Sequence, residues 1–125
     1  MFRSLFSRKA IPLSGTPAVR RMKTYSAQSG YVYQYYYEGH RGATFVFSVS
    51  ADRKTWSAVT VAVRDRALES WEQAHARELS DTERYAVAKM ALFQAFDEPP
   101  TPAGMRAPVE VRPADVEAII ETLGL

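Results

Sequence analysis

Between residues 30 and 64 apolar and polar side chains alternate with a period of two. Every second position from Tyr31 to Tyr37 is a tyrosine, and residues 44–50 and 56–64 are rich in β-branched and aromatic side chains. Glycine, aspartate and lysine separate the three runs. This pattern predicts three consecutive antiparallel strands joined by short turns, because side chains on a strand point alternately to its two faces.

The register between these strands decides which side chains share a face. We expect Tyr37 to lie opposite Phe45, and Phe45 to lie opposite Val63 on the third strand. One face then collects tyrosines, phenylalanines and valines, and the other face mixes polar and apolar residues. We therefore expect the tyrosine face to be buried and the mixed face to stay partly in contact with solvent.

After Asp65 the spacing of apolar positions changes to that of a helix. Leu68 begins an apolar stripe that predicts a first helix ending near Leu79. Ser80 and Glu83 have the spacing of a capping box, so a second helix is expected to begin there. That helix continues to about Asp97, where two prolines follow.

The end of the chain predicts a short strand and a last helix. Residues 98–108 hold four prolines and a glycine, which indicates a surface loop, and residues 109–112 are expected to form a short edge strand. A helix is predicted from Pro113 to Leu123. The expected fold is α+β: a three-stranded antiparallel meander, with a possible fourth edge strand, covered on one face by a two-helix hairpin and the C-terminal helix.

The length of 125 residues suffices for one hydrophobic core, so a single domain is expected. Residues 1–20 contain two prolines and a glycine, and only Phe2, Leu5 and Phe6 offer a helical apolar stripe. This pattern indicates a flexible basic arm ahead of a globular domain at residues 21–125. The arm is rich in arginine and serine and lacks acids, a composition that also describes a mitochondrial presequence. We expect a cytoplasmic protein, or a mitochondrial one if the arm is a presequence.

The net charge of +2 conceals two oppositely charged parts. Residues 1–37 hold six basic residues and no acidic one, whereas residues 38–125 hold ten basic and fourteen acidic residues. The predicted domain is therefore acidic as a whole and should repel nucleic-acid phosphates at long range. The chain has no cysteine and two histidines, and no apolar run approaches the ~18 residues of a membrane span.

The mixed face of the sheet supplies the leading candidate site. Tyr36, Val46 and Trp56 fall on this face, and an exposed aromatic cluster on a small domain often marks a surface for a partner. We therefore expect a non-enzymatic module that binds another protein or a second copy of itself. No catalytic residue, cofactor or metal is assigned.

Two alternatives belong to other classes of function. Single-stranded nucleic acid could bind through the basic arm and the tyrosine strand, and Arg20, Arg21, Lys23 and Arg41 are the candidate phosphate contacts.

The second alternative is a site for a small ligand or for hydrolysis near His75. Glu72 and His75 have the spacing at which helical side chains meet, and His40 lies in a glycine-flanked turn.

Overall fold

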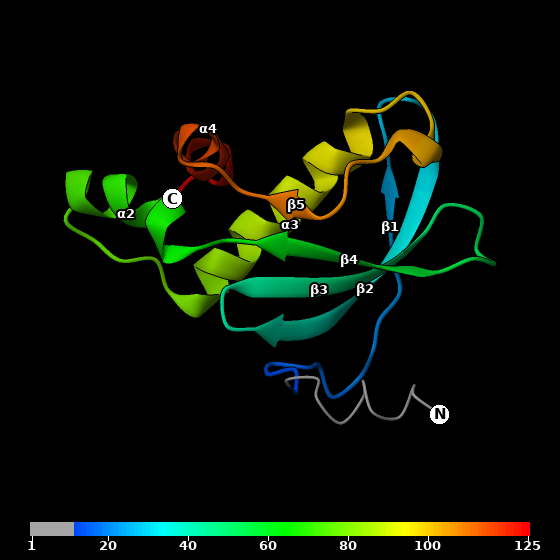
Figure 1. Cartoon of the computed structure of the whole chain (residues 1–125), viewed down its shortest axis with the longest axis horizontal. Helices are drawn as coiled ribbons and strands as arrows, with labels where there is room; N and C mark the ends of the chain where they lie inside the picture. Colours follow the sequence, from blue (N-terminus) through cyan, green and yellow to red (C-terminus); the bar gives the residue numbers. More distant parts are fainter. Residues whose placement is uncertain (1–11) are drawn as a thin grey trace.

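Five strands form one curled sheet in the order β1-β2-β3-β4-β5, and the helices lie on one side of it (Figure 1). The structure is a computed structural model that describes residues 12–125. Its elements, in chain order, are β1 (Lys23–Ser26), β2 (Val32–Arg41), β3 (Thr44–Ser50), β4 (Ser57–Ala62), α2 (Asp65–Ala74), α3 (Asp81–Asp97), a short 3₁₀ turn (Pro102–Gly104), β5 (Val109–Glu110) and α4 (Pro113–Leu123). The α+β class is as expected.

The number of strands differs from the prediction. β1 is an additional antiparallel strand, in which Tyr25 lies opposite Tyr33 of β2. Only one of its four residues is apolar, so the sequence shows no alternation there, and the strand owes its conformation to pairing with β2. The expected edge strand is β5, and it runs parallel to β4 with Val109 opposite Val61.

The tyrosine face of β2 packs against α3, as expected from the alternation. Tyr33 is 1% exposed, and its ring stacks on Phe96 of α3 with ring centres 4.2 Å apart. Tyr35 is also buried and Tyr37 is half-buried. Tyr31 differs: it precedes β2 and is 43% exposed. We call the side of the sheet that faces α3 the inner face, and the opposite side the outer face.

The strand register is shifted by two residues from the expected one. Tyr37 lies opposite Phe47 instead of Phe45, and Phe45 lies opposite Val61 instead of Val63. A shift of two keeps Tyr33, Tyr35, Phe45, Phe47 and the valines of β4 on the expected inner face. In the first hairpin β2 is longer than predicted and continues to Arg41, and a β-bulge between Tyr37 and Gly39 leaves the net shift at two residues.

The helices begin as predicted but pack differently. Ser80 and Glu83 form the capping box at the start of α3, with each side chain accepting a backbone N–H of the other residue. α2 ends at Ala74, five residues before Leu79, and His75 caps it. α2 and α3 do not form the expected hairpin: α2 packs against α4, whereas α3 packs against both α4 and the sheet. Within residues 12–125, every helix is too short or too polar to cross a lipid bilayer.

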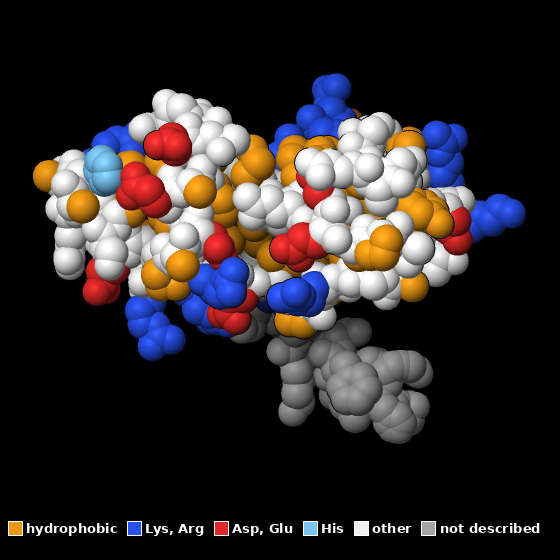
Figure 2. Space-filling model, turned by 90° about the horizontal axis from the view of Figure 1, so that it is seen from above, with side chains coloured by type: hydrophobic (Ala, Val, Ile, Leu, Met, Phe, Trp, Pro, Cys, Tyr) orange, Lys and Arg blue, Asp and Glu red, His pale blue; other side chains and the backbone are white. Residues whose placement is uncertain are grey.

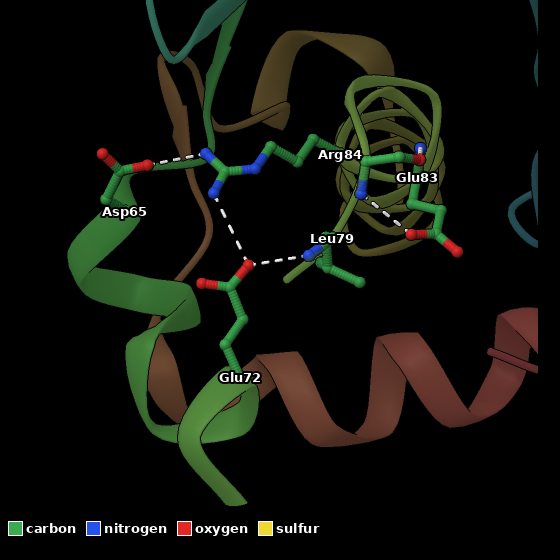
Figure 3. Close-up of polar contacts among 6 residues, drawn as sticks. Asp65, Glu72, Leu79, Glu83 and Arg84 are labelled. Atoms are coloured by element: carbon green, nitrogen blue, oxygen red, sulfur yellow. Dashed lines mark hydrogen bonds and ion pairs between the residues drawn. The ribbon is translucent and has the colours of Figure 1, made fainter. Parts of the chain in front are cut away.

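A polar network joins α2 to the start of α3 (Figure 3). The guanidinium group of Arg84 contacts the Asp65 carboxylate at 2.6 Å and the Glu72 carboxylate at 3.5 Å. Glu72 also accepts the backbone N–H of Leu79 at 2.8 Å. The network holds the loop between the helices in place. It therefore also fixes the start of α3, which lines a cavity described below.

Residues 12–20 run along β2 beyond the end of β1. Ser14 and His40 exchange two backbone hydrogen bonds of 2.8 Å, and the Thr16 hydroxyl donates to the Glu38 carbonyl at 2.8 Å. These bonds satisfy backbone groups of β2 that β1 does not reach. The boundary between arm and domain at residue 20 stays a prediction, and residues 1–11, with the presequence hypothesis, lie outside the described residues.

Candidate interaction surface

Two of the predicted interface residues meet on the outer face. Tyr36 lies opposite Ser48 of β3, and Trp56 immediately precedes β4. Their ring centres are 5.3 Å apart, a separation typical of favourable aromatic pairs. Trp56 is 37% exposed and Tyr36 is half-buried, so the pair presents an apolar surface to solvent while its base is packed on the sheet.

Arg20 completes this group from the N-terminal segment. Its guanidinium carbon lies 4.0 Å from the centre of the Tyr36 ring, within the range of a cation–π contact. The same guanidinium donates two hydrogen bonds to the Glu38 carboxylate, at 3.1 and 2.5 Å. We call Arg20, Tyr36 and Trp56 the outer cluster. Arg20 was predicted as a phosphate contact, and the structure instead places it against an aromatic ring and an acid.

The acid beside the outer cluster is held in its charged form. Hydrogen bonds from Arg20 and from the Ser48 hydroxyl, the latter at 2.5 Å, lower the pKa of Glu38 below its usual value. The hydrogen bond to Glu38 likewise raises the pKa of Arg20. Since Arg20 is well exposed, this ion pair adds little to the stability of the fold, and its main effect is to orient the guanidinium over Tyr36.

Val46, the third predicted interface residue, lies on the outer face but is only 7% exposed. It belongs to β3, the central strand, where it lies between Gly39 and Thr60 of the neighbouring strands. A side chain so placed offers almost no surface to a partner. The third residue of the outer cluster is therefore Arg20, and not Val46 as predicted from the sequence.

The remaining basic candidates are spread from just before β1 to the end of β2. Arg21 and Lys23 are exposed, and both line a small cavity on the inner side together with Tyr35. Arg41 lies at the far end of β2, opposite Thr44, and is half-buried. The structure thus separates the four predicted phosphate contacts into one on the outer face, two beside an inner cavity and one at a strand end.

The predicted ligand residues Glu72 and His75 do not contact each other. Glu72 accepts from Leu79 and contacts Arg84, as described above. The His75 ring stacks on Trp71 at 4.2 Å, and its Nδ1 lies 2.9 Å from the Trp71 carbonyl oxygen. Among residues 12–125, no group of three or more histidine and acidic side chains is arranged to hold a metal ion.

His40 lies on the inner face, which the sequence did not indicate. The bulge before Gly39 reverses the alternation, so that His40 lies opposite Phe45 with ring centres 5.6 Å apart. It lines a cavity of about 510 Å³ with Tyr37, Tyr85 and Arg84. The sequence did not indicate that Tyr85 and Arg84 line a cavity. Helical spacing marks Tyr85 only as a core position and Arg84 only as a surface position. The glycine inside the alternating run was the one signal of a bulge.

No protein-family model, no curated protein and no solved structure matches this chain. On the face seen in Figure 2, basic and acidic side chains are interspersed with hydrophobic ones. The features that remain to indicate a function are the outer cluster and the inner cavities.

Proposed function

We propose that this protein is a non-enzymatic interaction module that associates with a second copy of itself through the outer face of its sheet. The observation that carries the proposal is the outer cluster, in which Arg20 and Trp56 each contact Tyr36 and Trp56 is partly exposed. Tryptophan, tyrosine and arginine are the residues that most often dominate the binding energy of protein interfaces.

A second copy of the protein suits this surface because the surface carries both a positive and a negative side chain. Arg20 and Glu38 lie side by side next to the aromatic pair. In a two-fold symmetric contact the same patch meets itself, so the cation of one copy can face the acid of the other. The aromatic rings of the two copies would bury each other at the centre, where water is excluded.

Sedimentation velocity over a range of protein concentrations tests the proposal. The wild-type protein should show a concentration-dependent shift from monomer to dimer. Trp56→Ala should weaken the association by about tenfold or more, because truncating a central aromatic residue at an interface typically costs ~2 kcal/mol or more. Since Trp56 is partly exposed and contributes little to the core, the variant should fold normally.

Leu125→Ala is the matched control. Leu125 is also an exposed large apolar residue, but it lies at the C-terminus, beyond α4. The control should dimerise as the wild type does. A wild-type protein that stays monomeric at all concentrations, or a Trp56→Ala variant that dimerises equally well, would show that the outer cluster is not a self-association surface.

A further inference from the structure

A second, smaller cavity lies between the N-terminal segment, the inner face of β2 and α3. Its volume is about 170 Å³. Three tyrosine rings form much of its wall, from Tyr35, Tyr37 and Tyr85, and Pro17 and Val19 close it on the side of the N-terminal segment. The rings of Tyr37 and Tyr85 are packed together, with centres 4.7 Å apart. The body of any occupant would therefore contact mainly apolar and aromatic groups.

Two cations complete the lining, and no acid is among the lining residues. Arg21 and Lys23 both line the cavity, and neither forms an ion pair with an acid within the described part of the chain. The charges of Arg21 and Lys23 are therefore available to an anion in this cavity.

A third cation lies next to the cavity. The ammonium group of Lys89 is 5.9 Å from the centre of the Tyr85 ring and 6.0 Å from that of Phe93. Burial, and then the charge of Lys23, lower the pKa of Lys89. Lys89 thus adds a third positive charge near the cavity, and this charge favours an anion over a cation there.

The size of the cavity limits the kind of anion. Its volume is about six times the ~30 Å³ that one water molecule occupies in the liquid. That is too small for a drug-sized molecule, which needs roughly 300–1,000 Å³. It suits a single small ring or a short aliphatic chain with one charged group.

We propose that this cavity binds a small organic acid whose apolar body packs on Tyr35, Tyr37 and Tyr85 and whose carboxylate is held by Arg21 and Lys23. Arginine can bind a carboxylate through two parallel hydrogen bonds, and lysine adds a flexible positive charge. An aromatic carboxylate fits best because its ring can stack on tyrosine. The mainly apolar wall disfavours inorganic phosphate, and the absence of a lining acid disfavours an amine.

Titration with benzoate, followed by NMR of the tyrosine ring signals, tests the proposal. Benzoate should shift the signals of the three cavity tyrosines in a saturable way. Benzyl alcohol has a ring of the same size without the charge, and at the same concentrations it should give much weaker shifts. If benzyl alcohol binds as tightly as benzoate, the cavity selects only for apolar shape, and the proposed role of the cations is wrong.

Charge-removing variants locate the site. Lys23→Gln should weaken benzoate binding about tenfold, the loss expected for one hydrogen bond to a charged group. Lys54→Gln is the matched control, because Lys54 is an exposed lysine in the turn between β3 and β4. Tyr85→Phe removes a hydroxyl and keeps the ring, and it should leave the fold intact while changing the shift pattern. Equal affinities for Lys23→Gln and Lys54→Gln would overturn the proposal.

Two further titrations distinguish this cavity from the outer face and from a nucleic-acid surface. Trp56→Ala alters only the outer face, so it should bind benzoate as the wild type does, whatever its effect on dimerisation. A single-stranded oligodeoxythymidine should leave the tyrosine signals unchanged. If the oligonucleotide shifts those signals and benzoate does not, Arg21 and Lys23 belong to a nucleic-acid surface and the proposal is wrong.

Discussion

Two tyrosines on neighbouring strands face α3 with very different surroundings for their hydroxyl groups. Tyr25 donates a hydrogen bond of 2.7 Å to the Asp97 carboxylate at the end of α3. The hydroxyl of Tyr33 is buried and has no hydrogen-bond partner among the described residues, although its ring stacks on Phe96. A buried polar group without a partner reduces stability, whereas a hydrogen bond to a charged group increases it.

Replacing each tyrosine by phenylalanine separates these contributions. Tyr33→Phe should leave the free energy of unfolding unchanged or raise it by up to about 1 kcal/mol, because it removes only an unpartnered hydroxyl. Tyr25→Phe should lower it by about 1–2 kcal/mol, because Asp97 loses a donor. Urea unfolding of both variants measures the difference. A larger loss for Tyr33→Phe than for Tyr25→Phe would contradict this assignment of the hydroxyl groups.

The effect of Tyr25→Phe should also depend on pH. The hydrogen bond to Asp97, together with burial, raises the pKa of Tyr25 to about 12. A pKa that is higher in the folded state stabilises the fold while the phenol is protonated. The stability difference between the wild type and Tyr25→Phe should therefore be complete below pH ~10, the ordinary pKa of tyrosine. It should disappear as the pH rises through 12.

Single residues also show which parts of the site the sequence could predict. Tyr36 and Trp56 share a face because alternation alone places them there. The burial of Val46 and the stacking of Arg20 on Tyr36 depend on strand order and on the path of residues 12–20, and neither of these leaves a periodic signal in the sequence. Alternation assigns a residue to a face, but it does not say what covers that residue.

At the scale of the elements, the bulge in β2 has the largest consequences. It changes the register of the first hairpin by one residue and turns His40 to the inner face. Gly39 has a φ of +126° at this point. A side chain there would clash with the N-terminal segment, since its Cβ would lie 2.7 Å from the Ser14 carbonyl oxygen and 2.8 Å from the Thr16 hydroxyl. The bulge and the docking of residues 12–20 therefore depend on each other.

Gly39→Ala tests this dependence. The variant should lose about 2–4 kcal/mol of unfolding free energy, because both backbone strain and a steric clash are introduced. Gly42→Ala is the control: Gly42 also has a positive φ, of +56°, but no atom lies within 4 Å of the position of its Cβ. It should cost only about 1 kcal/mol. Thermal or urea unfolding gives both values, and equal losses would mean that the segment does not pack on Gly39.

The elements themselves were predictable where local signals are strong. The capping box of Ser80 and Glu83 and the prolines after Asp97 define α3, and Pro113 marks the start of α4. β1 was missed because its conformation comes from pairing with β2. α2 proved shorter than its apolar stripe suggested because the chain turns at His75, so that Leu79 enters the core from the loop.

At the scale of the whole molecule, the sheet separates two surfaces of different character. The outer face presents the outer cluster, with an aromatic pair and a self-complementary ion pair. The inner side carries the cavities between the sheet, the N-terminal segment and α3. Arg20 and Arg21 are neighbours in sequence, yet Arg20 contacts the outer face and Arg21 lines an inner cavity. A partner on the outer face and a small anion inside could therefore bind at the same time.

The most direct test of the proposed function is an intermolecular contact seen between two copies. In a mixture of isotope-labelled and unlabelled protein, filtered NMR experiments detect only contacts between different chains. We expect cross-peaks that connect the rings of Tyr36 and Trp56 with a second copy. Intermolecular contacts that involve only other residues would contradict self-association through the outer face. The absence of any intermolecular contact at the highest protein concentration tested would contradict it as well.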